Sequence, residues 1–203
     1  MSIPFQNSET AKNLLRAFAG ESQARNRYDF AANLCQKQEL QAMAFIFQAT
    51  AKQEQAHAKV FWDHLQALNG QNLPIYGAYP IEGTNRVLEL LRAAQHNEHE
   101  EHGSVYPSFA AIATQEGFPE AAASFRQIAA IEQLHGERFG LLADQLESGA
   151  LFVSQIETGW MCLNCGHTQN SLETPKQCPV CNHGQGWFIR LELAPWSPVV
   201  KQT

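Results

Sequence analysis

The chain of 203 residues lacks any long hydrophobic run, and its longest purely apolar stretch, Ala42–Phe47, is far too short to cross a bilayer. It also lacks a basic surplus: 14 Lys and Arg stand against 20 Asp and Glu, and the net charge of -6 argues against a nucleic-acid-binding protein. No basic segment followed by an apolar one opens the chain, so we expect no signal peptide and a cytoplasmic location. Charged residues are scarce at 17%, but 44% of the residues are hydrophobic, which is enough to build a folded core.

Cysteine is almost absent from the first three quarters of the chain, where only Cys35 occurs. The other four cysteines lie between residues 162 and 181, and three of the four tryptophans, Trp160, Trp187 and Trp196, also follow residue 150. The acidic excess is confined to the other part, because residues 1–150 carry 11 basic and 17 acidic side chains while residues 151–203 carry 3 of each. This contrast predicts two domains, residues 1–150 and residues 151–203.

Four segments of the first domain predict long amphipathic helices, because apolar residues recur in them at steps of three and four. The third series is Val87, Leu91, Ala94, Glu98, Glu101, Val105, Ser108 and Ile112. Ser8 and Thr84 are predicted to cap the first and third helices, and Gly103 and Pro107 predict a kink or bulge within the third. The segment Gly70–Gly83, rich in Pro and Gly, predicts a long crossover, so the expected fold class is an all-α four-helix bundle of the ferritin-like kind.

A glutamate interrupts the apolar face of every helix. These residues are Glu21, Glu54, Glu98 with Glu101, and Glu132. An unpaired carboxylate in an apolar core is costly, and the series contain no matching row of Lys or Arg, so a metal cluster is the predicted compensating cation. Glu54-x-x-His57 and Glu132-x-x-His135 each place a carboxylate and an imidazole on one helical face. Two such motifs plus glutamates from the two other helices are typical of di-iron or di-manganese carboxylate proteins.

Other polar residues near this face have simpler interpretations. Tyr28 and Tyr106 are candidates for donating a hydrogen bond to a ligand carboxylate, and core packing explains them nearly as well. His96, His99 and His102 recur at steps of three, and a solvated polar face is the simpler interpretation than a second metal site.

The four late cysteines form two Cys-x-x-Cys pairs, which predict a tetrahedral four-cysteine metal site. They are Cys162, Cys165, Cys178 and Cys181. Gly166 and Asn182 follow the pairs, where a positive φ would let backbone N–H groups point at the sulfurs. About fifty residues make too small a core alone, so the metal is expected to be structurally necessary. The spacing does not separate iron from zinc, and a redox centre and a zinc ribbon both remain open.

These motifs together resemble the rubrerythrin family, in which a ferritin-like di-iron bundle precedes a small rubredoxin-like β/loop domain whose single iron is bound by four cysteines. The resemblance is carried by Glu21 to Tyr28, Glu54-Gln-Ala-His57, Glu98-His-Glu-Glu101, Tyr106-Pro107, Glu132-Gln-Leu-His135 and the paired cysteines. It implies that Glu21, Glu54, Glu98, Glu101, Glu132 and His135 ligate two irons, that His57 alternates with Glu101 as a ligand, and that Tyr28 and Tyr106 lie near the cluster. Asn97, His102 and Val105 depart from the family pattern around the ligands.

The resemblance further implies an enzyme that reduces hydrogen peroxide to water and protects against oxidative stress. Electrons would pass from a separate NAD(P)H-dependent reductase through the cysteine-bound iron to the di-iron centre. A homodimer is expected, and the long crossover would allow helices to be exchanged between subunits. Two alternatives remain at this point: a ferroxidase or iron-handling protein built on the same bundle, and a binding module with a zinc ribbon and an inert metal in the bundle.

Overall fold

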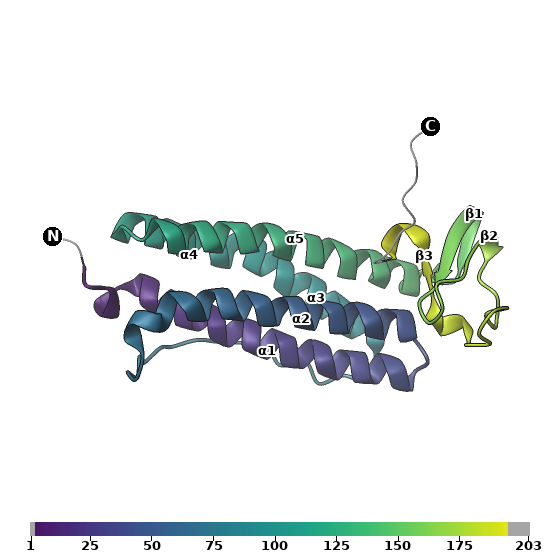
Figure 1. The fold of residues 1–203 in the computed structure, drawn as a ribbon, viewed down its shortest axis with the longest axis horizontal. Helices are drawn as coiled ribbons and strands as arrows, with labels where there is room; N and C mark the ends of the chain where they lie inside the picture. Colours follow the sequence, from purple (N-terminus) through teal and green to yellow (C-terminus); the bar gives the residue numbers. More distant parts are fainter. Residues whose placement is uncertain (1–2, 195–203) are drawn as a thin grey trace.

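The computed structural model describes residues 3–194 and shows a long helical bundle with a small sheet at one end (Figure 1). Its main helices are α1 (Glu9–Lys37), α2 (Gln41–His64), α3 (Val87–Glu100), α4 (Tyr106–Glu116) and α5 (Pro119–Glu147). Short 3-10 turns occupy Phe5–Asn7, Leu65–Leu68, Gln185–Trp187 and Leu191–Leu193. The predicted ferritin-like bundle is confirmed, with α3 and α4 forming its third member. Trp196 and the end of the predicted second domain, residues 195–203, lie outside the described residues.

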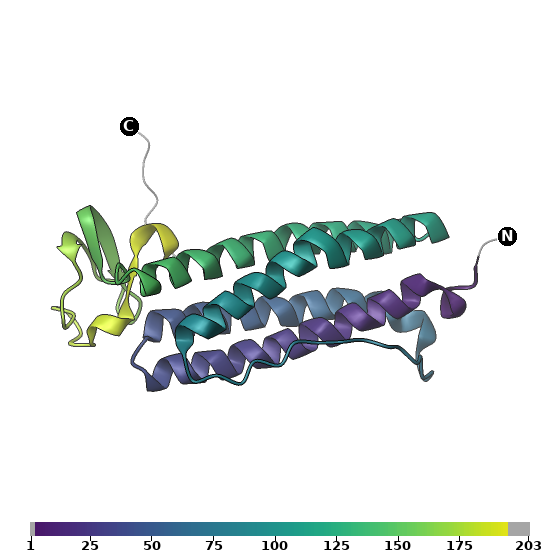
Figure 2. The same ribbon diagram turned by 180° about the vertical axis from the view of Figure 1, so that it is seen from behind.

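The bundle consists of two antiparallel helix pairs, one formed by α1 and α2 and the other by α3–α4 and α5. Each helix packs more extensively within its own pair than against the other pair. The predicted crossover is confirmed: after the 3-10 turn Leu65–Leu68 that follows α2, the chain runs back along α1 without regular structure before α3 begins (Figure 2). Because of this return, α2 and α3 run in the same direction. The two pairs therefore face each other across the centre of the bundle.

The third helix contains a π-helical segment, η3 (Glu101–Val105), between α3 and α4. The kink or bulge predicted there is thus present, but its effect on the buried face was not predicted. The first part of the series is buried as far as Glu98, whereas Ser108 is exposed and the buried positions of α4 are Tyr106, Ala110 and Ala113. A π turn inserts one extra residue into the helix, so every later side chain moves to a new face. The predicted series is therefore wrong after η3, and this shift is what brings Tyr106 into the core.

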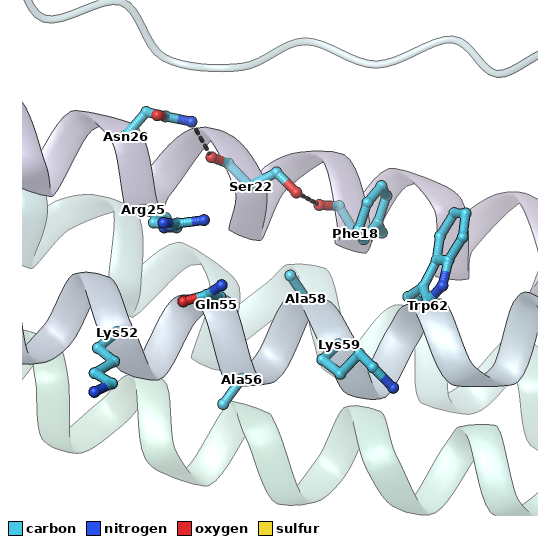
Figure 3. Close-up of a pocket in the computed structure, with 10 residues that line it drawn as sticks. All are labelled: Phe18, Ser22, Arg25, Asn26, Lys52, Gln55, Ala56, Ala58, Lys59 and Trp62. Carbon is cyan, nitrogen blue, oxygen red and sulfur yellow. Dashed lines mark hydrogen bonds between the residues drawn. The ribbon is translucent and has the colours of Figure 1, made fainter.

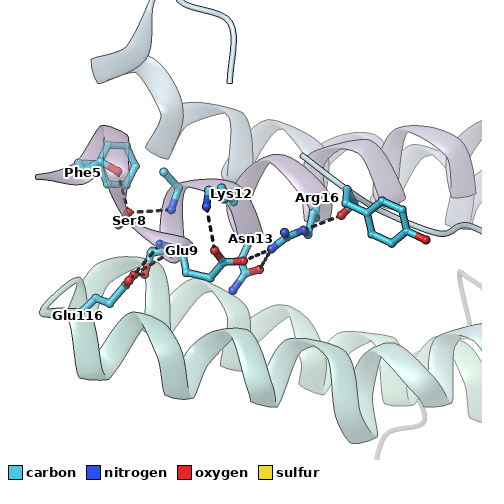
Figure 4. A network of polar contacts seen from close by, with 10 residues as sticks. Phe5, Ser8, Glu9, Lys12, Asn13, Arg16 and Glu116 are labelled. Atoms are coloured by element: carbon cyan, nitrogen blue, oxygen red, sulfur yellow. Dashed lines mark hydrogen bonds and ion pairs between the residues drawn. The ribbon is translucent and has the colours of Figure 1, made fainter. Parts of the chain in front are cut away.

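The first helix begins as predicted, because the Ser8 side chain accepts a hydrogen bond from the backbone N–H of Ala11 at 3.0 Å. Glu116 at the end of α4 also caps it: its carboxylate accepts the backbone N–H of Glu9 at 3.0 Å and of Thr10 at 2.8 Å (Figure 4). The predicted cap at Thr84 is wrong. The residue before α3 is Arg86, whose own backbone N–H donates to the Thr84 hydroxyl at 3.2 Å, two residues too early for a cap.

The C-terminal region is a three-stranded antiparallel sheet in the order β2–β1–β3. Its strands are β1 (Val153–Cys162), β2 (Thr168–Glu173) and β3 (Phe188–Arg190). Trp160 is fully buried in its small core and donates its indole N–H to the Ser171 carbonyl at 3.0 Å. Met161 and Ile189 on the other face join the apolar cluster at the end of the bundle. The expected β/loop domain is thus present and packs on the bundle. Within residues 3–194, no helix combines the length and the apolar character needed to span a membrane.

Candidate metal centres

Six carboxylate and imidazole side chains converge at the middle of the bundle, and all of them were predicted from the sequence. They form two groups, Glu21, Glu54, His57 and Glu132, and Glu54, Glu98, Glu132 and His135. Within each group the candidate ligand atoms lie within 4.8 Å of one another. Glu54 and Glu132 belong to both groups, so the geometry describes two adjacent cation positions that share two carboxylates. Each position has in addition one glutamate and one histidine of its own.

His57 and His135 each contact the two carboxylates that the groups share. The Nδ1 atom of His57 lies 3.0 Å from Glu54 Oε2 and 3.0 Å from Glu132 Oε1. The Nδ1 atom of His135 lies 2.8 Å from Glu132 Oε2 and 3.0 Å from Glu54 Oε1. The Glu-x-x-His spacing explains this arrangement, because residues three apart lie on the same helical face. Each imidazole therefore contacts one carboxylate of its own helix and one from the facing helix.

The cluster is buried, and several of its inward atoms approach one another closely but form no hydrogen bond of good geometry among the described residues. These atoms are Glu21 Oε2, Glu54 Oε1, Glu98 Oε2, both oxygens of Glu132, and Nδ1 of His135. Buried polar atoms are normally paired, and carboxylate oxygens left facing one another in a core are strongly unfavourable. Oxygen-rich donor sets with imidazole suit iron or manganese. The residues present therefore fit a pair of such ions held between them.

The pKa values of the clustered side chains also indicate that the site favours positive charge. Burial raises the pKa of the Glu98 carboxyl to about 8. Burial also acts to raise the pKa of Glu54, but the neighbouring imidazoles of His135 and His57 outweigh it and lower that pKa to about 2. Burial acts to lower the pKa of His135, yet the surrounding carboxylates raise it to about 12. With protein groups alone, the imidazoles thus serve as the cations that offset the acids.

Two buried tyrosines bind the outer oxygens of the cluster. Tyr28 of α1 donates its hydroxyl to Glu98 Oε1, and Tyr106 of α4 donates its hydroxyl to Glu21 Oε1. Each bond joins one helix pair to the other, and each leaves the second oxygen of the same carboxylate facing the cation position. The tyrosines thus orient two carboxylates.

One residue near the site was not singled out from the sequence. The side-chain oxygen of Gln53 on α2 lies 3.0 Å from Nε2 of His135 on α5. A hydrogen bond at Nε2 fixes the tautomer of the ring and leaves Nδ1 free to face the cluster. The sequence signal was weak, since a glutamine beside a glutamate on a helix has many explanations.

Glu101 and the histidine series His96, His99 and His102 lie outside the two groups. Glu101 is half-buried at the start of η3, where it lines a cavity beside the cluster rather than joining the convergent ligand atoms. His96 and His99 are exposed, and His102 bonds the carbonyl of Ala129 at 2.8 Å. Among the described residues these histidines belong to no group of three or more candidate metal ligands.

The second predicted site lies in the C-terminal sheet domain. The four cysteine sulfurs form one group, with Cys162 Sγ 3.7 Å from Cys181 Sγ and Cys165 Sγ 3.6 Å from Cys178 Sγ. Tetrahedral coordination with metal–sulfur bonds of about 2.3 Å places sulfurs at about this separation, whereas a disulfide needs about 2.05 Å. The sulfurs are therefore arranged for a metal.

Both cysteine pairs adopt the predicted turn. Gly166 has φ of 76° and Asn182 has φ of 59°, which glycine and asparagine tolerate better than other residues. A backbone N–H at His183 donates to Cys181, and this hydrogen bond is the main reason why the pKa of that thiol falls to about 6. At Cys181 the turn thus presents an N–H group to sulfur and favours the thiolate, which is the form that binds metals.

A large hollow on the surface has a different lining from the two candidate sites. It has a volume of about 740 Å³ and lies on the outer side of α1 and α2, where Figure 3 shows Arg25, Lys52, Lys59 and Trp62 around it. None of the six clustered side chains lines it. Its charged lining is basic, so it offers no carboxylate ligands for a metal.

Comparisons with known proteins find matches to both parts of the chain. The family model for rubrerythrin matches residues 12–143, and the model for the rubredoxin-like domain of rubrerythrin matches residues 160–189. The chain is 43% identical to the rubrerythrin of Porphyromonas gingivalis over 93% of this chain and 92% of that protein. It is 41% identical to the rubrerythrin of Clostridium perfringens over 90% of this chain and 94% of that protein.

Solved structures show the same fold. The fully reduced, all-ferrous state of nigerythrin matches with a TM-score of 0.61 at 25% identity, over 94% of this chain and 88% of that chain. A bacterioferritin of Mycobacterium tuberculosis matches with a TM-score of 0.61 at 17% identity, over 73% of this chain and 90% of that chain, which shows a shared bundle alone. Given a di-iron ferritin-like site with carboxylate and histidine ligands, a four-cysteine rubredoxin-like site, and relatives above 40% identity along nearly its whole length, the chain belongs to the rubrerythrin family.

Proposed function

We propose that the protein is a non-haem di-iron peroxidase that reduces hydrogen peroxide to two molecules of water. The observation that carries this proposal is the pair of adjacent cation positions that share Glu54 and Glu132, in the same chain as a four-cysteine site. Two electrons and two protons are needed for each peroxide. An iron bound by four cysteines carries one electron at a time. It is therefore suited to returning, one after the other, the two electrons that the di-iron centre donates to each peroxide.

The proposed ligands are the six clustered side chains together with Glu101, which would alternate with His57. These residues would hold two ferrous ions, which would supply the two electrons needed to break the O–O bond of the peroxide. In the structure His57 belongs to the convergent group and Glu101 does not, and Glu101 lies on the same side of the cluster as a cavity. This difference supports an exchange in which only one of the two residues is a ligand at a time.

The protein groups have separate tasks. Tyr28 and Tyr106 hold Glu98 and Glu21 by their outer oxygens, which keeps the inner oxygens directed at the cation positions. The fully buried Phe47 and Phe61 belong to the apolar clusters on either side of the site, and such clusters exclude bulk water from it. The ligands are therefore fixed in advance of the reaction.

Electron delivery is proposed to start at the exposed edge of the four-cysteine site, where Cys165 is exposed and Cys181 is half-buried. The donor would be a separate NAD(P)H-dependent reductase. The C-terminal domain contacts the bundle near Glu39, and the helical rise from there to Glu54 corresponds to about 20 Å. Because the C-terminal domain and the metal cluster of one subunit are separated by this distance, we propose a homodimer in which the cysteine-bound iron of one subunit passes electrons to the bundle of its partner.

The test is anaerobic. The iron-loaded protein is reduced, hydrogen peroxide or dioxygen is added, and the absorbance of the cysteine-bound iron is followed. Faster reoxidation by peroxide than by dioxygen is expected, and equal or slower reoxidation would overturn the peroxidase proposal. Consumption of added Fe(II) with mineral formation would indicate the ferroxidase alternative, and zinc in the four-cysteine site without visible absorbance would indicate a binding module. A Glu54→Ala variant with full activity would overturn the site assignment instead.

A further inference from the structure

A second cavity, of about 310 Å³, lies beside the metal cluster where the crossover passes between α1 and η3. Glu101 and Tyr106 line it on the inside, and crossover residues 77–80 line it on the outside. Tyr106 is almost fully buried, and its hydroxyl donates to Glu21. The inner end of this crossover cavity therefore lies one hydrogen bond from a carboxylate of the metal cluster.

Two other cavities of similar or larger size have no such connection. The hollow of about 740 Å³ on α1 and α2 and a groove of about 390 Å³ between α4 and α5 are lined by none of the clustered side chains, by neither buried tyrosine, and not by Glu101. Among these three spaces, only the crossover cavity links the surface to groups that touch the site.

Tyr79 narrows the outer side of this cavity. Its hydroxyl donates to the carbonyl of Arg16 at 2.9 Å, which fixes the ring on α1. A methyl group built on Gly20 would lie 3.5 Å from the ring, and one built on Gly77 would lie 3.0 Å from it. The ring thus fits against two glycines, one on the helix and one on the crossover itself.

The crossover is also fixed to both helix pairs at Glu82. Arg27 of α1 donates to the two oxygens of this carboxylate at 2.9 and 3.1 Å, and Asn97 of α3 donates to Oε1 at 2.7 Å. The Arg27 and Glu82 side chains are mostly buried, so the pair is better protected from solvent than a surface salt bridge. Asn97 lines the cavity as well. The outer wall of the cavity is therefore held in a fixed position.

We infer that the crossover cavity is the channel by which hydrogen peroxide reaches the metal site, and that the Tyr79 ring sets its width. This inference rests on the proposed function. The cavity is large enough for a small polar molecule, it is lined by both polar and apolar side chains, and its inner residues contact or neighbour the cluster. A channel of fixed width excludes bulkier hydroperoxides and so makes the site selective by size.

Two substitutions test the channel in the full-length, iron-loaded protein. Ala78→Phe places a large ring on an exposed lining position and is expected to lower the second-order rate constant for hydrogen peroxide by about tenfold, which corresponds to about 1.4 kcal/mol at the barrier. Tyr79→Ala widens the channel and is expected to raise the rate for tert-butyl hydroperoxide, relative to that for hydrogen peroxide, by about tenfold. Tyr79→Phe keeps the ring and is expected to keep the wild-type ratio. Ala111→Phe, in the groove between α4 and α5, is the matched control and is expected to leave both rates unchanged.

A second readout separates the channel from the peroxidase proposal. Azide is a small anion that binds ferric di-iron sites, and its association is followed by absorbance without any turnover. Slower azide association in Ala78→Phe but not in Ala111→Phe supports the channel even if peroxide proves a poor substrate, in which case only the proposed function is overturned. Unchanged azide and peroxide rates in Ala78→Phe, or an unchanged hydroperoxide ratio in Tyr79→Ala, would overturn the inference.

Discussion

The hydrogen bond between Gln53 and His135 provides a sharp test of how the metal site is organised. The side-chain oxygen of Gln53 accepts from Nε2 of His135 at 3.0 Å, while Nδ1 of the same ring lies 2.8 to 3.7 Å from three carboxylate oxygens. Replacing Gln53 by Leu keeps the size of the side chain and removes the acceptor. The ring then loses the contact that fixes its tautomer and its angle toward the cluster. We expect weaker metal binding with an unchanged fold.

The magnitude follows from the exposure of Gln53. Outer hydrogen-bond partners of metal-bound histidines typically contribute roughly 10- to 100-fold to metal affinity. Gln53 lies on the exposed side of α2, so water can replace part of its contact with the ring. The effect on metal affinity should therefore lie at the lower end of this range. Gln53→Leu is expected to weaken Fe(II) binding by about tenfold, or about 1.4 kcal/mol.

The assay is an anaerobic competition for Fe(II) between the full-length protein and a chromophoric chelator. Gln55→Leu is the matched control, because Gln55 is an exposed glutamine on the same helix that lines the outer hollow instead of contacting His135. Gln53→Glu keeps an acceptor oxygen and is expected to retain wild-type affinity. If Gln53→Leu binds Fe(II) as tightly as wild type, or if Gln55→Leu loses as much, the proposed role of Gln53 is refuted.

Three further predictions concern stability and metal content. Tyr106→Phe leaves a buried oxygen of Glu21 unpaired at a cost of about 1–3 kcal/mol, so thermal unfolding should show a Tm lower by about 5 °C, whereas Tyr76→Phe at an exposed position should not change it. Burial acts to raise the pKa of Glu116, but hydrogen bonds from Thr10 and Glu9 outweigh it and lower that pKa, so the ionised form stabilises the fold above the ordinary glutamate value of 4.5. The stability difference between wild type and Glu116→Gln, measured by denaturant unfolding, should therefore shrink as the pH falls below that value, and a difference independent of pH would contradict the cap. Cys178→Ser should remove the visible absorbance of the cysteine-bound iron and leave iron in the bundle, and metal analysis showing loss at both sites would contradict the independence of the two centres.

The sequence predicted the ferritin-like bundle and the residues that converge in it because apolar residues and glutamates recur in the four helices at steps of three and four. A Glu-x-x-His motif is set by residues only three apart on one helix. Once Glu54 and Glu132 lie on the buried faces of their helices, the packing of the bundle brings them together. The paired cysteines are equally local, since each turn needs only its own glycine or asparagine.

Other features depended on contacts between distant segments. Gly103 and Pro107 indicated an irregularity in the third helix, but nothing in the 3–4 spacing shows that the π turn η3 moves the buried face of α4 by one residue. The bond from Gln53 to His135 joins helices that are far apart in the sequence, and so does the cap that Glu116 provides to the start of α1. Thr84 carries the usual hydroxyl of a cap, but the chain still follows the crossover at that point and the helix starts later.

The division of the clustered residues between the two helix pairs has a consequence for assembly. Glu21, Glu54 and His57 precede the crossover, and Glu98, Glu132 and His135 follow it, so neither half of the chain holds a complete cation position. Bound ions would link the two helix pairs, whose helices otherwise pack more extensively within each pair than between the pairs. The same metal link would form whether the two helix pairs come from one chain or from two. The crossover could then determine which chains are joined without altering the chemistry of the site.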